Sequence, residues 1–534
     1  MLRFGKFGAG RKPSTANHHT GLHMDKLNLA IWVVGIALGG AFVYLLYNYI
    51  RGLWGSPREL FILFITKIIE YAAYGATNMC FVLYLSSDVG LSDIEAGSFI
   101  GFWSMGLTLT TIFVGAVCDA IGIKKTLLIG TIVLIISRIV MPFTSNFWIA
   151  FIFGFIPLAL GVGIMGPVLS VGIKRFTTKE GTAMGFALFY TLMNVGWALG
   201  GIIFDTVRGI FGEHAGASFG AVHFSTYQII FLVGFFLSIP NLILIILMRD
   251  RVRMTEEQGV VIDPKGEELH GSTFSVATQT IKNAVRDTGN IFGQAVREKA
   301  FWYFLFMLGI LVFVRLVFYH FHYTFPKYGI RVLGEGVKIG NIYGVLNPTM
   351  IVFLVPLVGY LTRKISSYKM MVVGTTISAV SVFIATMPAE IFSPWMNTWF
   401  AELIFNRWLK VPAEMQQPVF FTLIVFIFTF TVGESIWSPR LMQFTAEIAP
   451  VGREGSYIAL SYLPYFGAKF IAGPMSGWLV ATYTPEGAAS YPNHYWVWIW
   501  IGGMAALSPL GLIIFRKLFH AAENAHKNDH KATA

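Results

Sequence analysis

The sequence predicts an all-α protein that crosses a membrane many times, built as two bundles of six helices with an extra N-terminal helix. Three observations predict this. Apolar stretches of about 20 residues, the length of a helix that crosses a bilayer, recur along nearly the whole chain. The chain is 55% hydrophobic and only 13% charged, against roughly 25% charged residues in soluble domains. The connections between the apolar stretches alternate between basic and nearly uncharged.

The apolar segments fall into two groups, separated by a long polar stretch. Only helices and closed barrels satisfy the backbone polar groups in lipid, and these segments lack the alternating pattern of barrel strands. Each segment is therefore predicted to be a helix. The first group is 59–86, 93–118, 125–143, 147–173, 181–204 and 226–249, and the second is 300–322, 337–361, 369–388, 417–438, 455–483 and 493–516.

The positive charges predict the orientation of these helices. Cytoplasmic loops of membrane proteins are enriched in Lys and Arg. The connections at 86–92, 144–146 and 484–494 contain neither. An integral protein of an inner or plasma-type membrane with a cytoplasmic C-terminus is therefore expected. The basic connections on the cytoplasmic side carry Lys124, Lys125, Lys174, Arg175, Lys179, Arg363, Lys364 and Lys369.

Residues 28–50 form a further apolar stretch. Three interpretations stay open for it: a thirteenth spanning helix, a helix lying against the core or the interface, and translation starting at Met24. We expect an extra peripheral helix. In the long stretch between the two groups, the second half has a spacing of apolar residues compatible with an amphipathic helix on the membrane surface. The predicted organisation is an N-terminal tail (1–27), the extra helix (28–50), the first bundle (51–249), a cytoplasmic linker with an amphipathic helix (250–299), the second bundle (300–517) and a C-terminal tail (518–534).

Composition and motifs argue against several classes of protein. The net charge of +11 is explained by basic cytoplasmic loops, so no nucleic-acid partner is expected. Cys80 and Cys118 lie in apolar helices, which predicts small buried side chains rather than a disulfide or a metal site. No phosphate-binding glycine loop, zinc motif or nucleophile elbow occurs, so we do not expect an enzyme.

A short motif follows the second predicted helix of the first bundle. It runs from Gly115 through Asp119 and Gly122 to Lys124 and Lys125. Glycines permit close helix approach and a sharp turn, and an acidic side chain can pair with cations or a neighbouring helix end. We expect this motif to act at a junction that changes between conformations.

This motif resembles the loop signature of the major facilitator superfamily, with Ile123 where an arginine is usual. The matching place in the second half, Gly359 to Arg363, is a weaker echo of it. A paired position in two halves is typical of an internal repeat. The resemblance implies the major facilitator fold, alternating access to a central site, and a protein that functions as a monomer.

Three other stretches resemble the proton-coupled oligopeptide transporters within that superfamily. Residues 189–196 read FYTLMNVG, similar to a signature of the fifth helix of that family. Residues 433–439 read GESIWSP, similar to the tenth helix, and Asn347-Pro348 is similar to the eighth. The resemblance implies that Glu434 and Trp437 lie near the substrate.

The sequence departs from that family in two of its charged stretches, and it has two residues between Asp119 and Gly122 where the family usually has three. Its first helix usually carries Glu-x-x-Glu-Arg before Tyr-Gly, whereas Lys67 and Glu70 precede Tyr74-Gly75 here and the arginine is missing. Gly166-Pro167 replaces a Lys-Pro pair in the fourth helix. Whether this chain transports peptides, and whether it uses the usual route of proton coupling of that family, therefore stays open.

Ionisable side chains inside the membrane are costly, which makes them functional candidates. Glu434 is the leading candidate for a titrating residue, because burial favours its protonation and a nearby cation opposes it. Glu70 is the second, and it lies three residues from Lys67, close enough to pair with it on one helical face. Arg315 is a candidate partner of Glu434, and Lys469 is either an anion anchor that replaces the missing lysine or a side chain that reaches the surface.

Other polar residues are weaker candidates. His320 and His322 are expected to be solvated at a helix end, and their spacing argues against a helical metal pair. Arg138 is a functional candidate for which a structural role is an equal alternative. Five further residues are candidates for the cavity wall, with interhelical packing as the alternative: Tyr71, Tyr74, Asn78, Tyr190 and Asn194.

Together these patterns favour a secondary active transporter for a small polar or peptide-like solute, coupled to H⁺ and without a cofactor. The expected partners are the solute and the lipid bilayer. Two alternatives stay open: a facilitator or flippase for an amphipathic molecule, which the aromatic content favours, and a receptor on a transporter fold, which flux measurements distinguish.

Overall fold

The computed structural model describes residues 16–262, 299–448 and 463–518, with isolated positions between 278 and 297. It divides into two compact units, residues 1–54 and residues 55–534. The first unit is described by one helix, α1 (Ala16–Gly52), which contains the whole apolar stretch 28–50. A helix there is confirmed, and whether it spans the membrane stays a prediction.

The first six-helix bundle follows the predicted segments. A π-helical segment links α5 to α6, and a 3-10 turn follows α4. The prediction of six helices here is confirmed. Their bounds are α2 (Arg58–Ser87), α3 (Asp93–Ile121), α4 (Ile123–Val140) with η1 (Met141–Phe143), α5 (Phe147–Ile149) with η2 (Ala150–Phe155) and α6 (Ile156–Phe176), α7 (Lys179–Phe211) and α8 (Thr226–Leu247).

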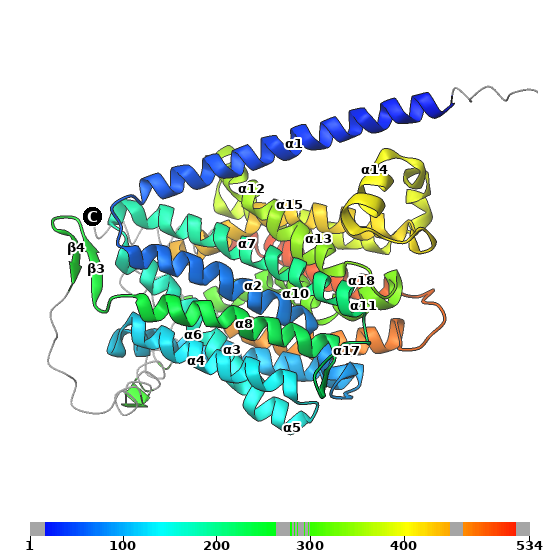
Figure 1. The fold of residues 1–534 in the computed structure, drawn as a ribbon. Helices are drawn as coiled ribbons and strands as arrows, with labels where there is room; N and C mark the ends of the chain where they lie inside the picture. The colour runs from blue at the N-terminus through cyan, green and yellow to red at the C-terminus, as the bar shows by residue number, and fades with distance from the viewer. Residues whose placement is uncertain are drawn as a thin grey trace, which may run out of the picture. The chain divides into compact units, whose positions relative to one another are not determined.

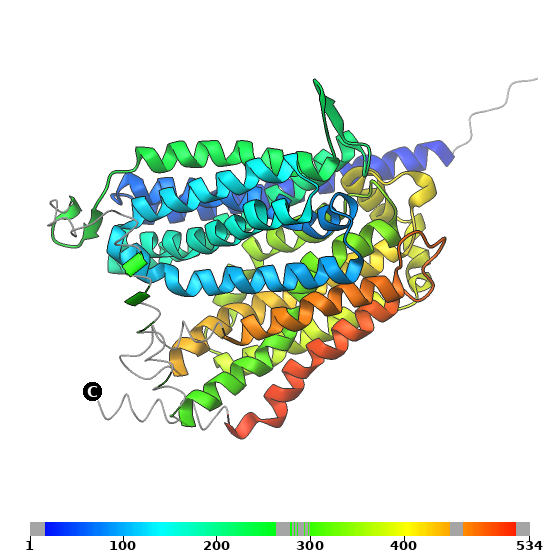
Figure 2. The same cartoon turned by 90° about the horizontal axis from the view of Figure 1, so that it is seen from below.

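The second bundle also has the six predicted helices, although residues 455–462 of one of them lie outside the described residues. Figure 2 separates the bundles, with the helices of residues 58–247 (lighter blue to green) on one side and those of residues 299–514 (green to red) on the other. The bounds are α10 (Lys299–Tyr323), η3 (Asn341–Val345) with α12 (Leu346–Leu361), α13 (Ser367–Val382) with η4 (Phe383–Thr386), α15 (Val419–Ile448), α17 (Leu463–Tyr483) and α18 (Tyr495–Ile514).

Within the described part of the chain, ten helices are long and apolar enough to cross a membrane. Smaller elements that the sequence did not predict lie in the connections (Figure 1). Two antiparallel hairpins pair Ala217 with Phe224 and Val252 with Ile262. Most of the predicted amphipathic linker helix lies outside the described residues. The smaller elements are β1 (Ala217–Phe219), β2 (Val222–Phe224), β3 (Val252–Thr255), β4 (Gly259–Ile262), α11 (Phe325–Leu333), η5 (Ala389–Asn397), α14 (Trp399–Ala401), η6 (Glu402–Leu409) and η7 (Ala413–Met415).

The two ends of the unit of residues 55–534 differ in the connections between their helices. We call the end that carries the β1–β2 hairpin the hairpin end, and the end that carries the α3–α4 turn the Gly122 end. Gly122 has φ +88°, a conformation that favours glycine, so the chain turns there without a loop. Lys124 Nζ then donates to the carbonyl of Met248 at 2.6 Å, and satisfies a free carbonyl at the end of α8.

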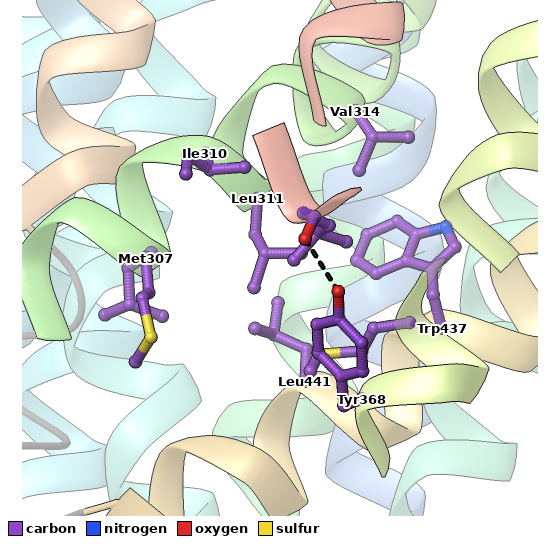
Figure 3. Packing of buried hydrophobic residues seen from close by; sticks show 10 residues of the cluster. Met307, Ile310, Leu311, Val314, Tyr368, Trp437 and Leu441 are labelled. Atoms are coloured by element: carbon purple, nitrogen blue, oxygen red, sulfur yellow. Dashed lines mark hydrogen bonds between the residues drawn. The ribbon is translucent and has the colours of Figure 1, made fainter. Parts of the chain in front are cut away.

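The core of the second bundle is an apolar cluster contributed by four of its helices. Figure 3 shows Leu311 and Val314 of α10 beside Trp437 of α15. The Tyr368 hydroxyl, which comes from α13, donates to the carbonyl of Leu512 in α18 at 2.7 Å. Trp437 is fully buried, and its indole N–H donates to Ser378 Oγ at 3.1 Å. This cluster fixes the mutual position of α10, α13, α15 and α18.

A seam of glycines joins the bundles near the hairpin end, where α3 packs against α17. Gly97 and Gly101 face Gly473 and Gly477, so each helix presents glycines four residues apart. A Cβ built on Gly101 would lie 2.8 Å from the Lys469 carbonyl oxygen and 2.9 Å from Gly473 Cα. Small residues at such a spacing let helix backbones approach closely in membranes.

We expect Gly101→Ala to lower the free energy of unfolding by about 1–3 kcal/mol, since one methyl group overfills the seam. Thermal unfolding in detergent measures this. The matched control is Gly106→Ala, five residues along the same helix, where a Cβ meets nothing within 4 Å. Equal melting temperatures for the two variants would contradict the role of the seam.

Candidate functional site

A cavity of about 530 Å³ lies between the two bundles. The helices α2, α3 and α7 line it from the first bundle, and α10, η3, α12, α15 and α17 line it from the second. Most of its wall is aromatic or apolar. Its charged, imidazole and amide side chains are Asn194, Arg315, His322, Asn347, Glu434 and Lys469, and hydroxyl groups come from Thr108, Thr111, Tyr190, Tyr319, Tyr343, Ser438 and Tyr465.

Glu434 lies in the cavity wall with one defined partner. Its Oε2 accepts a hydrogen bond from Asn347 Nδ2 at 2.7 Å, and the same amide donates to Thr431 Oγ1 at 2.9 Å. Asn347 belongs to α12 and Glu434 to α15, so the contact joins two helices of the second bundle. The side chain of Glu434 is therefore held in place by a neutral amide rather than by a cation. A carboxyl in such a place can take up a proton without breaking an ion pair.

Arg315 is the main cation of the cavity. It is half-buried, and its guanidinium lies 5.8 Å from the ring centroid of Phe318 and 5.4 Å from that of Tyr465. Among the described residues it has no hydrogen-bond or ion-pair partner, so the expected ion pair with Glu434 is not formed in this conformation. A guanidinium carries five donors, and Arg315 lines the cavity.

Lys469 also lies in the cavity wall, rather than reaching the protein surface. It belongs to α17, yet its Nζ donates to the Ser104 carbonyl at 3.1 Å and to Thr108 Oγ1 at 2.7 Å, both on α3. It lies 5.6 Å from the ring centroid of Tyr319. Lys469 thus connects the two bundles at the inner end of the glycine seam through neutral acceptors only.

The structure corrects the expected pairing of Lys67 with Glu70. Glu70 instead binds Arg138 of α4 in two bonds of 2.6 and 3.0 Å, and Arg138 also donates to Ser238 Oγ at 2.7 Å. Lys67 Nζ lies over two rings, 3.8 Å from the centroid of Tyr71 and 3.9 Å from that of Phe189. All three charged side chains are buried inside the first bundle. Helical spacing alone could not reveal the cation on α4, because that contact joins residues 68 positions apart.

The remaining polar candidates divide between the cavity and the layer behind it. Tyr190 and Asn194 line the cavity, and Asn194 Nδ2 donates to the carbonyl of Tyr190 at 2.9 Å. The rings of Tyr71 and Tyr74 pack on Trp197, which lines the cavity. Two others lie away from it: Asn78 is buried in the first bundle, and Trp437 lies in the apolar cluster.

His320 is fully buried and His322 is half-buried, which corrects the expectation that both are solvated at a helix end. His320 Nδ1 shares a hydrogen bond of 2.8 Å with Thr324 Oγ1. His322 lines the cavity and stacks on Trp197, with ring centroids 5.1 Å apart. The helix α10 continues to Tyr323, so these side chains lie inside the protein. The spacing of seven residues between Arg315 and His322 was the signal in the sequence that these two side chains share one face of the helix.

The proposed switch motif is described in part. Gly122 forms the turn, Lys124 binds the end of α8, and Lys125 is exposed. The surroundings of Gly115 and of the Asp119 side chain lie outside what the structure describes. In the second half, Gly359 lies near the end of α12, and Arg363 lies over the ring of Tyr360 at 5.3 Å.

Two polar networks join the bundles at the hairpin end. In the first, Asp93 of α3 binds Lys327 at 2.6 Å and Arg331 at 2.7 Å, both on α11. Burial lowers the pKa of Lys327 below its ordinary value, and the charge of Asp93 offsets this only in part. Arg331 also donates to Glu486 at 3.2 Å.

The second network lies between α7 and the segment before α12. Asp205 accepts from the backbone N–H of Gly340 at 2.9 Å and of Asn341 at 2.6 Å, which places a carboxylate at the start of η3. Arg208 binds Asp205 and Glu213 and donates to the carbonyl of Val337 at 3.1 Å. Burial alone would raise the pKa of Glu213, but the hydrogen bonds and charge of Arg208 outweigh it and hold that pKa below its ordinary value.

We expect Asp93→Asn to separate the bundles at the hairpin end, because Lys327 and Arg331 would stay buried without a counter-charge. Distances between spin labels on the exposed residues Ser218 and Ser490, measured by pulsed electron resonance, should shift towards longer values. Glu486→Gln is the control, since its 81% exposed side chain contributes little to an ion pair. Unchanged distances in Asp93→Asn would contradict this role.

Among the described residues, no group of three or more His, Cys, Asp or Glu side chains could hold a metal ion. Cys80 and Cys118 are both buried, as the sequence predicted.

A model of the Major Facilitator Superfamily matches residues 63–406. The curated relatives include "Uncharacterized transporter YclF" of Bacillus subtilis (strain 168), 26% identical over 180 residues, which cover 32% of this chain and 36% of that protein. "Protein ZINC INDUCED FACILITATOR-LIKE 1" of Arabidopsis thaliana is 26% identical over 164 residues, 29% of this chain and 33% of that protein. The chain thus spans about a third of the length of these relatives.

Solved structures match far more of the chain. A POT family transporter in complex with 5-aminolevulinic acid has a TM-score of 0.62 at 16% identity, covering 87% of this chain and 97% of that one. A D-xylose-proton symporter has a TM-score of 0.56 at 15% identity, covering 85% and 97%. At this identity the likeness is one of fold, and it confirms the predicted arrangement of two six-helix bundles.

Proposed function

Because this chain is a member of the Major Facilitator Superfamily, we propose that it is a secondary active transporter, coupled to protons, for a small organic solute that carries an anionic group. The observation that carries the proposal is the cavity between the bundles. It places the guanidinium of Arg315, which has no partner among the described residues, and the carboxyl of Glu434 in one wall.

The charges of the cavity support an anionic or zwitterionic solute. Arg315 and Lys469 contribute two cations and Glu434 one carboxyl, so protonation of Glu434 leaves positive charge for the solute. An Arg fork binds carboxylates in two parallel bonds. Lys469 stands as the second cation, in place of the lysine that is missing at Gly166. The solved POT family transporter with 5-aminolevulinic acid shows that this fold can hold a small solute with a carboxylate.

The charged side chains of the cavity would act during alternating access. The two bundles would rock about the central cavity, with the glycine seam and the two polar networks parting at the hairpin end as the opposite end closes. The enrichment of Lys and Arg at the Gly122 end favours a cytoplasmic location for it. Proton uptake by Glu434 would then accompany loading of the solute, and proton release would accompany its return.

A facilitator or flippase for an amphipathic molecule is the second candidate. The aromatic wall of the cavity favours it, because such a wall binds an apolar body as readily as a short peptide. This candidate differs from the first in one respect that can be measured, since a facilitator does not concentrate its solute against a gradient.

Uptake into proteoliposomes tests the proposal. We expect a pool of di- and tripeptides to include members that accumulate inside when the proton concentration is higher outside, identified by mass spectrometry. Collapse of the gradient with an ionophore should abolish accumulation. Saturable entry that ignores the gradient would favour the facilitator, whereas binding without any flux would indicate a receptor.

A further inference from the structure

One helix presents a continuous stripe of side chains along the cavity. Arg315, Phe318, Tyr319 and His322 of α10 all line it, at positions i, i+3, i+4 and i+7. Residues at these positions share one face of a helix. With a rise of about 1.5 Å per residue, Arg315 and His322 start about 10 Å apart along the axis. The stripe therefore has a cation at one end, two aromatic rings in the middle and an imidazole at the other end.

The His322 end of the stripe contains two polar atoms without a partner among the described residues. They are His322 Nδ1 and the hydroxyl oxygen of Tyr343, and both are buried. The two rings lie 6.1 Å apart between centroids, and both residues line the cavity. Buried polar groups in native proteins nearly always have a hydrogen-bond partner. These two atoms indicate that something other than the protein completes this end of the cavity.

The rings around these atoms favour a flat partner. His322 stacks on Trp197 of α7 with an angle of 17° between the two rings. The ring of Tyr74 also packs against Trp197, with the ring centroids 5.5 Å apart. Since His322 belongs to the second bundle and Trp197 to the first, the pocket at this end is built from both. Aromatic groups pack favourably on such surfaces. We call Trp197, His322 and Tyr343 the aromatic subsite.

We propose that the aromatic subsite binds an aromatic ring bearing a hydrogen-bonding group, at the far end of a solute whose anionic group is held by Arg315. This inference rests on the proposed function and narrows its substrate class to aromatic organic anions. The ring packs against Trp197 and His322, and its hydroxyl or N–H group bonds with His322 Nδ1 and the Tyr343 hydroxyl. The stripe along α10 sets the separation of the two ends.

Equilibrium binding to the purified protein, by calorimetry, tests the subsite with three probes. They are p-hydroxyphenylpropionate, its p-methyl analogue and the corresponding hydroxycyclohexyl acid. We expect wild type to bind the hydroxyphenyl acid roughly five- to tenfold more tightly than the methyl analogue, the effect of one hydrogen bond to a buried group. The hydroxycyclohexyl acid should bind more weakly than the hydroxyphenyl acid, since its ring is not flat.

Three variants separate the contributions. His322→Phe keeps a ring on Trp197 and removes the nitrogen, so the preference for the hydroxyl over the methyl group should disappear. Tyr343→Phe should reduce the same preference, and Trp197→Leu should reduce the preference for the flat ring. His320→Phe is the matched control, because His320 lies on the same helix outside the cavity and is bonded to Thr324; there the preferences should stay. Melting temperatures show whether each variant is folded.

Two results would overturn the subsite. One is equal binding of the hydroxyl and methyl acids to wild type, as expected if ordered water satisfies both buried atoms. The other is a hydroxyl preference that survives in folded His322→Phe. If none of the probes binds while proton-driven uptake of peptides proceeds, the aromatic class is wrong and the proposed function stands. If the probes bind with the expected preferences but no solute is transported, the proposed function fails and the subsite stands.

Discussion

Glu434→Gln is expected to abolish proton-driven accumulation, reducing it to the level of protein-free liposomes. The carboxamide has the size of the carboxyl and can still accept the hydrogen bond from Asn347 Nδ2, so folding should be retained. It cannot take up a proton, and the coupling step is lost. The Glu434 side chain is only 6% exposed in the wall of the cavity. Burial of a carboxyl is costly, and its presence there therefore points to a function.

Two measurements make this prediction sharp. Exchange of labelled for unlabelled solute, which needs no net proton movement, should persist in Glu434→Gln, whereas accumulation should not. The control is Glu390→Gln, on an exposed glutamate of η5 at the hairpin end, which should transport like wild type. Accumulation by Glu434→Gln at the rate of wild type would show that another group carries the proton.

Arg138→Met is expected to destabilise the protein by about 3–5 kcal/mol, because it leaves the carboxylate of Glu70 buried without its partner. Arg138 is fully buried, and it holds Glu70 with two short bonds and Ser238 with a third. Unfolding in detergent, followed by loss of helical signal, measures the difference.

The double variant Glu70→Leu with Arg138→Met distinguishes a structural pair from a working one. Replacement of both charges by apolar side chains of similar size is often neutral for stability, so we expect most of the loss to be recovered. If the recovered protein still accumulates solute, Glu70 has no part in coupling. A single variant as stable as wild type would contradict the ion pair itself. Glu335→Gln, in the exposed pair with His214, is the control.

The comparison of sequence and structure shows where each kind of reasoning works. The spanning helices were predicted because each must satisfy its own backbone in lipid and is about 20 residues long. These are local requirements. Most predicted ends lie within a few residues of the observed ones, but α7 and α15 extend seven and ten residues further than predicted. The short elements in the connections were missed, since α11 and the helical turns between α13 and α15 are stabilised by packing and not by a long apolar run.

Glu434, Arg315, Lys469, Tyr190 and Asn194 were candidates from sequence, and all five line the cavity. An ionisable or polar side chain in an apolar helix raises the free energy of inserting that helix into the membrane, so its presence points to a function. The sequence alone shows where such side chains occur. Glu434 and Asn347 both belong to stretches that were singled out, although their contact joins residues 87 positions apart.

The partners of the charges were decided by the tertiary structure alone. Glu70 binds Arg138 rather than the nearby Lys67, and Trp437 faces the core of its bundle rather than the cavity. His322 is half-buried and stacks on Trp197 of the other bundle instead of lying in solvent. The sequence by itself determined the helices and the cost of each buried charge, because both depend on a segment and its solvent. Which side chains meet depends on how the helices rotate and pack, and that is a property of the whole fold.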